Sequence, residues 1–243
     1  MKERTNLLEF ISKNLEGEIL DDCDIIVISS KIVAIAEGGL INLKDILASE
    51  EGRALATEFG IDERFAQLIL NEADTILGGP RKVIATIKRG IAIPFAGVDL
   101  SNVPLGHAVL WPKDPAGTAE EIRKFLLKSR GVKVGVIISD SQIVPLRSGT
   151  YGIALGIAGF LGAVDKRGSK DLFGKEMKVT RWGLADNLAS GANLVMGEGG
   201  ESSPIAIIKE APITQSDLDA HKLTQALLMN EEECLWAQFF NYY

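Results

Sequence analysis

The chain has 243 residues, of which 46% are hydrophobic and 24% are charged, and this is enough to bury a sizeable core as one unit over residues 1–243 or as two interleaved lobes. The formal net charge of −7, without a Lys/Arg cluster among aromatics, argues against a nucleic-acid partner. Two distant cysteines, a charged N-terminus and no apolar run of the roughly 20 residues that span a membrane predict a cytoplasmic protein without disulfides, structural zinc or membrane segments.

Apolar spacing along the chain predicts more strands than helices. Helical periodicity is expected over residues 4–16, 62–77, 118–129, 185–196 and 216–237, with a capping box at Thr118–Glu121 and a cap at Ser216. Strand-like apolar runs cover residues 23–38, 82–87, 90–95, 107–112, 132–139, 176–182 and 204–209. Because the two kinds of element do not alternate regularly, we predict an α+β fold with mixed or antiparallel sheets and packed helices.

Several common catalytic patterns are missing from the sequence. Glycines at positions 149, 152, 156 and 159 do not have the spacing of the dinucleotide-binding fingerprint, and they suit close packing of a backbone face instead. No P-loop motif occurs, and His107 and His221 lack partners for a Ser-His-Asp triad. An ordinary Rossmann oxidoreductase and a P-loop NTPase are therefore not the favoured classes.

Asp99, Asp140, Glu198 and the pair Ser30–Lys31 each lie at the end of an apolar run or in a glycine-rich turn, where a scaffold can aim functional groups. Each also has a structural interpretation, as a turn residue, a helix-terminating turn or a solvated lysine. Asp99 and Asp140 together suit Mg²⁺ or Mn²⁺ better than zinc.

The glycines around Glu198 could let backbone N–H groups approach phosphate while the carboxylate holds a metal. Arg147 offers a fork of donors for a carboxylate or phosphate, or is an ordinary surface arginine.

In this order, four segments resemble the coenzyme F420-0 γ-glutamyl ligase family: "SSKIVAIAEG", "AGVDLSN" followed by "LWPKDP", "GVIISDSQIVPLRSGTYGIALGIAG" and "DLFGKEMKVTRWGLADNLASGANLVMGEGGESSPIAII". The resemblance runs from about residue 1 to residue 210. It implies the fold of that family and a reaction in which GTP or ATP phosphorylates a carboxylate of the acceptor. The amine of L-glutamate then attacks the acyl phosphate, with two Mg²⁺ or Mn²⁺ ions at the phosphates. It also implies a homodimer, for which the apolar C-terminal residues 233–243 offer surface.

The resemblance also implies roles for individual residues. Asp99 and Asp140 match one metal site, and Ser141 with Glu198 matches a second. The positions that match nucleotide contacts are Ser30, Lys31, Asn102, Met196, Gly197, Glu198, Gly199, Gly200, Glu201, Ser202 and Ser203. Asp140 is the expected catalytic centre, and Arg147 is our own candidate for binding phosphate or an acidic substrate.

The sequence departs from the family pattern in ways that concern the substrates. It is expected to begin after an apolar segment that helps to bind the nucleotide, Ile35 stands where a lysine is usual, and Phe95 stands where a polar residue is usual. Phe95 could face the ring of an acceptor or belong to the core. The acceptor is F420-0 or, as in some proteins of the family, tetrahydrofolate. The competing class is a non-catalytic nucleotide- or flavin-binding module of the same fold.

Overall fold

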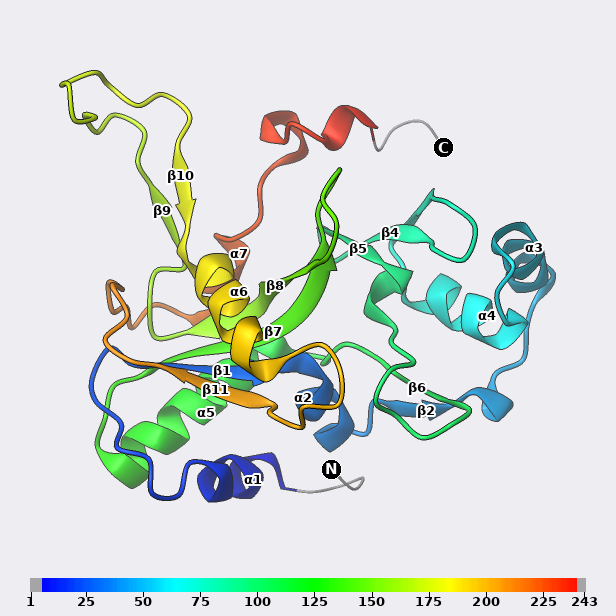
Figure 1. The fold of residues 1–243 in the computed structure, drawn as a ribbon, viewed down its shortest axis with the longest axis horizontal. Helices are drawn as coiled ribbons and strands as arrows, with labels where there is room; N and C mark the ends of the chain where they lie inside the picture. The colour runs from blue at the N-terminus through cyan, green and yellow to red at the C-terminus, as the bar shows by residue number, and fades with distance from the viewer. Residues whose placement is uncertain (1–5, 240–243) are drawn as a thin grey trace.

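The computed structural model describes residues 6–239, and a four-stranded sheet in the order β11–β1–β7–β8 forms its centre (Figure 1). Strands β1 (Ile25–Ser29) and β7 (Gly135–Ile143) run parallel, whereas β8 (Thr150–Ala158) and β11 (Ile205–Ile208) pair antiparallel with their neighbours. The central sheet is therefore mixed, and the predicted α+β class is confirmed.

Both faces of this sheet are covered by helices (Figure 1). Helices α1 (Leu7–Asn14) and α5 (Pro115–Arg130) pack on one face, and α6 (Leu184–Met196) packs on the other. Helix α7 (Ala220–Gln225) contributes one buried residue to the core on each face. Within the described residues no helix is both long enough and apolar enough to cross a bilayer.

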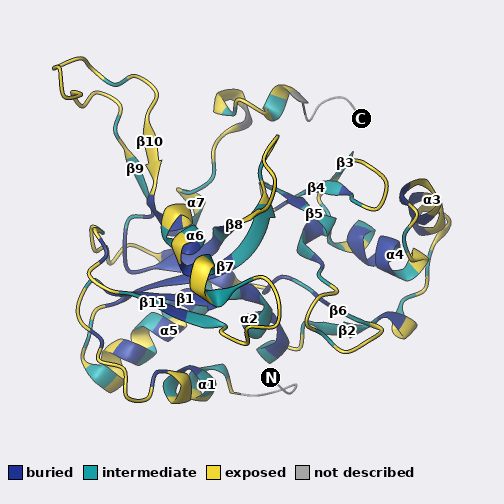
Figure 2. Cartoon of the chain, in the orientation of Figure 1, coloured by how far each residue is buried: buried dark blue, intermediate teal, exposed yellow. Residues whose placement is uncertain are grey.

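Alternation along β1 explains the two-sided burial. Ile26 and Ile28 join the core beneath α1 and α5, whereas Ile25 and Val27 join the core beneath α6. Successive strand residues point to opposite faces of a sheet, so a strand covered on both faces is apolar throughout. Figure 2 shows this continuous burial at the centre of the molecule.

A second group of elements lies beside the central sheet and has its own apolar cluster (Figure 1). Helices α3 and α4 and the antiparallel sheet β3–β4–β5 contribute to it, and the short pair β2–β6 lies below them. Their bounds are Glu50–Phe59 for α3, Glu63–Glu72 for α4, Thr75–Gly78 for β3, Ala85–Lys88 for β4, Ile91–Pro94 for β5, Leu40–Asn42 for β2 and His107–Val109 for β6.

Short elements connect and extend these two groups. Strands β9 (Ala163–Asp165) and β10 (Arg181–Gly183) carry a long excursion that projects from the body (Figure 1). The single-turn helices are η1 (Leu43–Asp45), η2 (Phe95–Gly97), η3 (Glu231–Glu233) and η4 (Ala237–Phe239). The last four residues of the apolar C-terminal segment lie outside the described residues.

The strand expected over residues 23–38 is wrong in its second half, which forms helix α2 (Ser30–Ala36). Val33, Ala34 and Ile35 are buried in succession, which suits a short helix packed on more than one side. A long apolar run does not by itself distinguish a buried strand from a buried helix.

The helix expected over residues 216–237 is wrong for most of its length. Helix α7 covers only Ala220–Gln225, and its first-turn N–H groups are capped by the Asp219 carboxylate rather than by Ser216. After this helix the chain turns, and Leu227 packs against the core cluster beneath α6.

Several other helices and strands begin or end at residues that differ from the predicted ones. Helix α5 begins at Pro115 after the cap residue Asp114, so the capping box expected at Thr118 does not start it. Helix α4 ends before Thr75, where β3 begins. Helix α3 and strands β2, β3, β8 and β9 were not predicted, and only the end of the run at 176–182 forms β10.

Two glycines of β8 pack closely against backbone, but against helices on opposite faces of the sheet rather than along the single backbone face that their spacing predicts. A Cβ atom on Gly152 would overlap the backbone of Ala189 in α6, and one on Gly156 would overlap the backbone of Pro115 and Ala116 in α5. The two helices therefore approach the strand so closely that any side chain at these positions is excluded.

Asp24 precedes β1 with a side chain that is 0% exposed, and it accepts hydrogen bonds from Lys209 Nζ, Asp21 N and Glu210 N. Burial alone would raise the pKa of this carboxyl, but those hydrogen bonds outweigh it, and the pKa lies below the usual value. The ionised form is thus the one that stabilises the fold.

We expect Asp24→Ala to lower the free energy of unfolding by about 1–3 kcal/mol, because it leaves two backbone N–H groups without their partner. A depressed carboxyl pKa stabilises the fold above the unfolded value of about 3.9, and this contribution is lost as pH falls through the folded pKa. Urea unfolding from neutral to acid pH would measure both effects. Asp217→Ala, at an exposed carboxylate, should change little, and an equal loss in both variants would contradict the assignment.

Candidate active site

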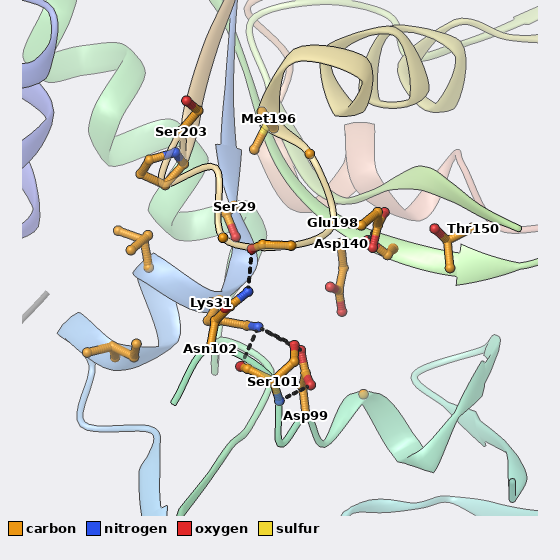
Figure 3. Close-up of a pocket in the computed structure, with 18 of the residues that line it drawn as sticks. Ser29, Lys31, Asp99, Ser101, Asn102, Asp140, Thr150, Met196, Glu198 and Ser203 are labelled. Carbon is orange, nitrogen blue, oxygen red and sulfur yellow. Dashed lines mark hydrogen bonds and ion pairs between the residues drawn. The ribbon is translucent and has the colours of Figure 1, made fainter. Parts of the chain in front are cut away.

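A cavity of about 810 Å³ opens beside the central sheet, where β1 ends and β7 continues past it. The parallel register pairs Ser29 with Ser139. Beyond this pair the chain leaves β1 to form α2, whereas β7 continues, so Asp140 and Ser141 still lie on a strand beside the start of that helix. The η2 turn, the loop after Asp99 and the loop between α6 and β11 form the other walls (Figure 3).

Most of the residues singled out from the sequence line this cavity. They are Lys31, Asp99, Asn102, Asp140, Ser141, Met196, Gly197, Glu198, Gly199, Gly200, Ser202 and Ser203. Ser30 is 4% exposed and does not line the cavity, whereas its neighbour Ser29 does. Glu201 and the exposed Arg147 are outside the lining, and Arg147 lies in the connection between β7 and β8.

Asp99 and Lys31 form an ion pair on one wall of the cavity. The Lys31 Nζ atom is 2.7 Å from Asp99 Oδ2 and also donates to the Ser101 carbonyl and hydroxyl oxygens. Burial would raise the pKa of Asp99, but the hydrogen bonds from Lys31 and Ser101 outweigh it and hold the pKa below its usual value. Asp99 is therefore an anion across the physiological pH range.

Asp140 extends from β7 toward Asp99 on the opposite wall (Figure 3). Burial, with a smaller contribution from the negative charge of Asp99, raises the pKa of its carboxyl to about 6 against the opposing hydrogen bond from Trp111. Two neighbouring carboxylates whose pKa values are pushed apart are a common feature of functional sites.

Glu198 and Ser141, which we expect from the sequence to share a metal site, are in direct contact. Ser141 Oγ donates to Glu198 Oε1 at 2.8 Å, and Asn193 Nδ2 donates to the same oxygen at 2.7 Å. Residues 57 positions apart in the chain thus meet because α6 ends above the strand that carries Ser141 (Figure 3).

The glycine-rich loop offers fewer free N–H groups than its sequence indicates. Gly197 N donates to the Asn193 carbonyl, and Gly199 N donates to Glu201 Oε2. Asn102 Nδ2 donates to the Gly199 carbonyl at 2.7 Å and fastens the loop to the opposite wall. A phosphate that bound the Gly199 N–H would have to displace Glu201.

The donor set suits a hard divalent cation that is shared with a substrate. Asp99, Asp140, Glu198 and Ser141 present oxygen atoms, the ligand type that Mg²⁺ and Mn²⁺ prefer. Among the described residues, however, no three His, Cys, Asp or Glu side chains are close enough to hold an ion by themselves. Mg²⁺ usually takes one or two carboxylates together with phosphate oxygens and water, so this arrangement fits an ion that arrives with a phosphate.

Phe95 is both a wall residue and a core residue. It lines the cavity, and its ring is 5.4 Å from that of Phe65 in the neighbouring apolar cluster. Phe95 and Ala96 have φ values of 56° and 54°, a conformation that costs non-glycine residues energy. The buried Thr86 hydroxyl accepts from Ala96 N and so holds this turn.

Sequence reasoning missed several residues of the site. Trp111 contacts Asp140, Ser101 contacts Asp99, and the cavity lining also includes Phe10 and Thr150. Trp111 lies in the run "LWPKDP", which follows the segment of Asp99 in the family resemblance, and this position could have indicated that it belongs to the site. Phe10 and Thr150 come from an amphipathic helix and a strand end, which carry no such signal.

Comparison with known families identifies the class to which this fold and site belong. Residues 1–210 match the family described as F420-0:Gamma-glutamyl ligase. The chain belongs to this family, and the resemblance drawn from its motifs is confirmed.

Individual relatives carry the name Coenzyme F420:L-glutamate ligase. The protein from Methanocaldococcus jannaschii is 43% identical over 212 residues, which cover 87% of this chain and 83% of that protein. The relative from Methanopyrus kandleri is 40% identical over 205 residues, covering 84% and 80% of the two chains. That from Archaeoglobus fulgidus is 37% identical over 209 residues, covering 86% and 83%.

Proposed function

We propose that the chain is a nucleotide- and metal-dependent γ-glutamyl ligase that joins the amine of L-glutamate to a carboxylate of F420-0. The names of its relatives and of its family support these two substrates. The observation that carries the proposal is that four separate segments of the chain bring their polar side chains to one cavity. These are the ion pair of Asp99 with Lys31, the Asp140 carboxylate, and the hydrogen-bonded pair of Ser141 and Glu198.

The reaction proceeds in two transfers. An acceptor carboxylate oxygen attacks the terminal phosphorus of GTP or ATP, and the nucleoside diphosphate leaves. The glutamate amine then attacks the carbonyl carbon of the acyl phosphate, loses a proton and expels inorganic phosphate. Every step concentrates negative charge in the cavity, so the site needs cations and fixed donors there.

The protein's own groups position these anions. Among the described residues that line the cavity, Lys31 alone is positively charged, and it can exchange its bond to Asp99 for a phosphate oxygen. Asp99, Asp140, Ser141 and Glu198 would hold one or two Mg²⁺ or Mn²⁺ ions, which supply positive charge to the transferring phosphoryl group when bound. Arg147 would clamp an acidic group of the substrate from the β7–β8 connection.

Lys31→Met tests the role of the cavity lysine. We expect the KM for the nucleotide to rise by about 10- to 100-fold, because a charge-assisted hydrogen bond to phosphate is worth about 1.5–3 kcal/mol. Steady-state kinetics with varied nucleotide would measure the change. Lys44→Met, at an exposed lysine of η1, is the matched control. An unchanged KM in the Lys31 variant would remove this residue from the nucleotide site.

The activity itself is tested by incubating the purified protein with glutamate, each nucleotide, each metal and each acceptor in turn. Mass spectrometry should find one or more glutamyl units added to F420-0 only when nucleotide and metal are both present. Addition to tetrahydrofolate instead would make folate the acceptor. Nucleotide binding without any product would favour the non-catalytic module, and sedimentation of the same sample tests the expected homodimer.

A further inference from the structure

Trp111 contacts the Asp140 carboxylate but is not among the residues that line the cavity. It follows β6, is 5% exposed, and donates its indole Nε1–H to Asp140 Oδ2. The η2 turn passes so close to the indole that a Cβ atom on Gly97 would overlap the ring. Ile93 and Leu155 belong to the same buried cluster. The indole is therefore fixed between the two parts of the fold.

An ion pair between a buried lysine and a half-buried glutamate lies over the same indole. Lys88 Nζ is 5.5 Å from the centroid of the Trp111 ring and 2.6 Å from Glu72 Oε2. Lys88 is 4% exposed, and burying an ammonium is costly unless it is paired. Its contacts with Glu72 and the face of the indole satisfy that need and hold the ring in place.

We propose that Trp111 is a positioning residue that orients the Asp140 carboxylate, and that the Lys88–Glu72 pair positions Trp111 in turn. The proposal rests on the role proposed above for Asp140. The indole occupies one carboxylate oxygen, which leaves the other to face the cavity and Asp99 (Figure 3). Partners of this kind fix the orientation of a ligand group, and their loss typically lowers metal affinity or activity about 10- to 100-fold.

A purely structural role for Trp111 predicts a different result. An indole that only fills space could be replaced by another aromatic ring at the expense of stability, with the kinetics unchanged. Trp111→Phe retains the ring and removes the donor. The matched control is Trp182→Phe, because Trp182 also faces a lysine, Lys166 at 5.6 Å, but lies on β10 away from the cavity.

The first measurement compares Mn²⁺ binding in the presence of GTP, by the paramagnetic resonance of the free ion, and the kcat and KM for Mn²⁺ in turnover. We expect Trp111→Phe to weaken Mn²⁺ binding and to lower kcat/KM for the metal at least 10-fold, and Trp182→Phe to match the unmodified protein. Lys88→Met, which keeps the indole and Asp140, should show a smaller loss in the same direction. If the Phe variant does not fold, this second variant decides the question. Unmodified affinity and turnover in a folded Trp111→Phe protein, or in Lys88→Met, would overturn the proposal.

The second measurement does not depend on turnover or metal. The three tryptophan side chains give separate indole N–H signals in a nitrogen-15 correlation spectrum, and Trp111→Phe assigns one of them. Asp140→Asn should shift that signal upfield, since a carboxylate is a stronger acceptor than an amide, and leave the Trp182 signal in place. An unmoved Trp111 signal would overturn the hydrogen bond even in an active enzyme. Inactivity of the unmodified protein would contradict the proposed function and not this contact.

Discussion

Asp140→Asn should lower kcat by about a hundred- to a thousand-fold, which is the usual effect of removing one preorganised charged group from an active site. The amide has nearly the same shape and can still accept the Trp111 N–H, but it cannot supply the negative charge that holds a cation against the substrate phosphates. Rapid-quench or steady-state assays of glutamyl addition would measure the loss.

The same substitution should not weaken the fold. Burial raises the pKa of Asp140 to about 6, so the folded state binds its proton more tightly than the unfolded state does. A raised carboxyl pKa means that stability falls as pH rises from about 4 through 6, and the neutral amide escapes that loss. Thermal melting at neutral pH should therefore give an equal or higher Tm. Asp45→Asn, at an exposed carboxylate, should change neither quantity, whereas an active Asp140→Asn enzyme would remove Asp140 from the chemistry.

The second large effect is on stability. Gly156→Ala should lower the free energy of unfolding by about 3 kcal/mol, at the upper end of the range for overpacking, because the new methyl group would overlap the backbone of α5. A backbone cannot move aside as a flexible side chain can, so the helix must shift away from β8. Chemical denaturation would measure the change.

Gly191→Ala is the matched control for that experiment. Gly191 lies within α6, and a Cβ atom there meets nothing within 4 Å. Alanine favours a helix over glycine by roughly 0.8–1.0 kcal/mol, so this variant should be slightly more stable than the unmodified protein. If both alanine variants were equally stable, the close approach of α5 to β8 would be disproved.

Local patterns in the sequence predicted those helices and strands that are buried in one regular way along their whole length. The runs that became β1, β5 and β7 and the windows that became α5 and α6 were recognisable because one structure buries each of them consistently. The junction at Ser30 and the end of α7 were not, since tertiary contacts decide there whether an apolar stretch continues, bends or becomes a helix.

The sequence predicted which residues belong to the candidate site better than it predicted how those residues contact one another. Asp99, Asp140 and Glu198 stood out because carboxylates follow apolar runs or lie among glycines. The contact of Ser141 with Glu198 was implied only by family resemblance. The pairing of Lys31 with Asp99, the use of the Gly199 N–H by Glu201 and the indole behind Asp140 depend on long-range packing, which spacing along the chain does not encode.

The most direct test of this account follows the oxygen atoms of the acceptor carboxylate. F420-0 labelled with oxygen-18 in that carboxylate is converted with glutamate and nucleotide, and the inorganic phosphate is examined by phosphorus NMR and mass spectrometry. Transfer through an acyl phosphate predicts that each phosphate released with product carries one labelled oxygen from the acceptor. Phosphate without label, formed alongside glutamylated product, would contradict the account.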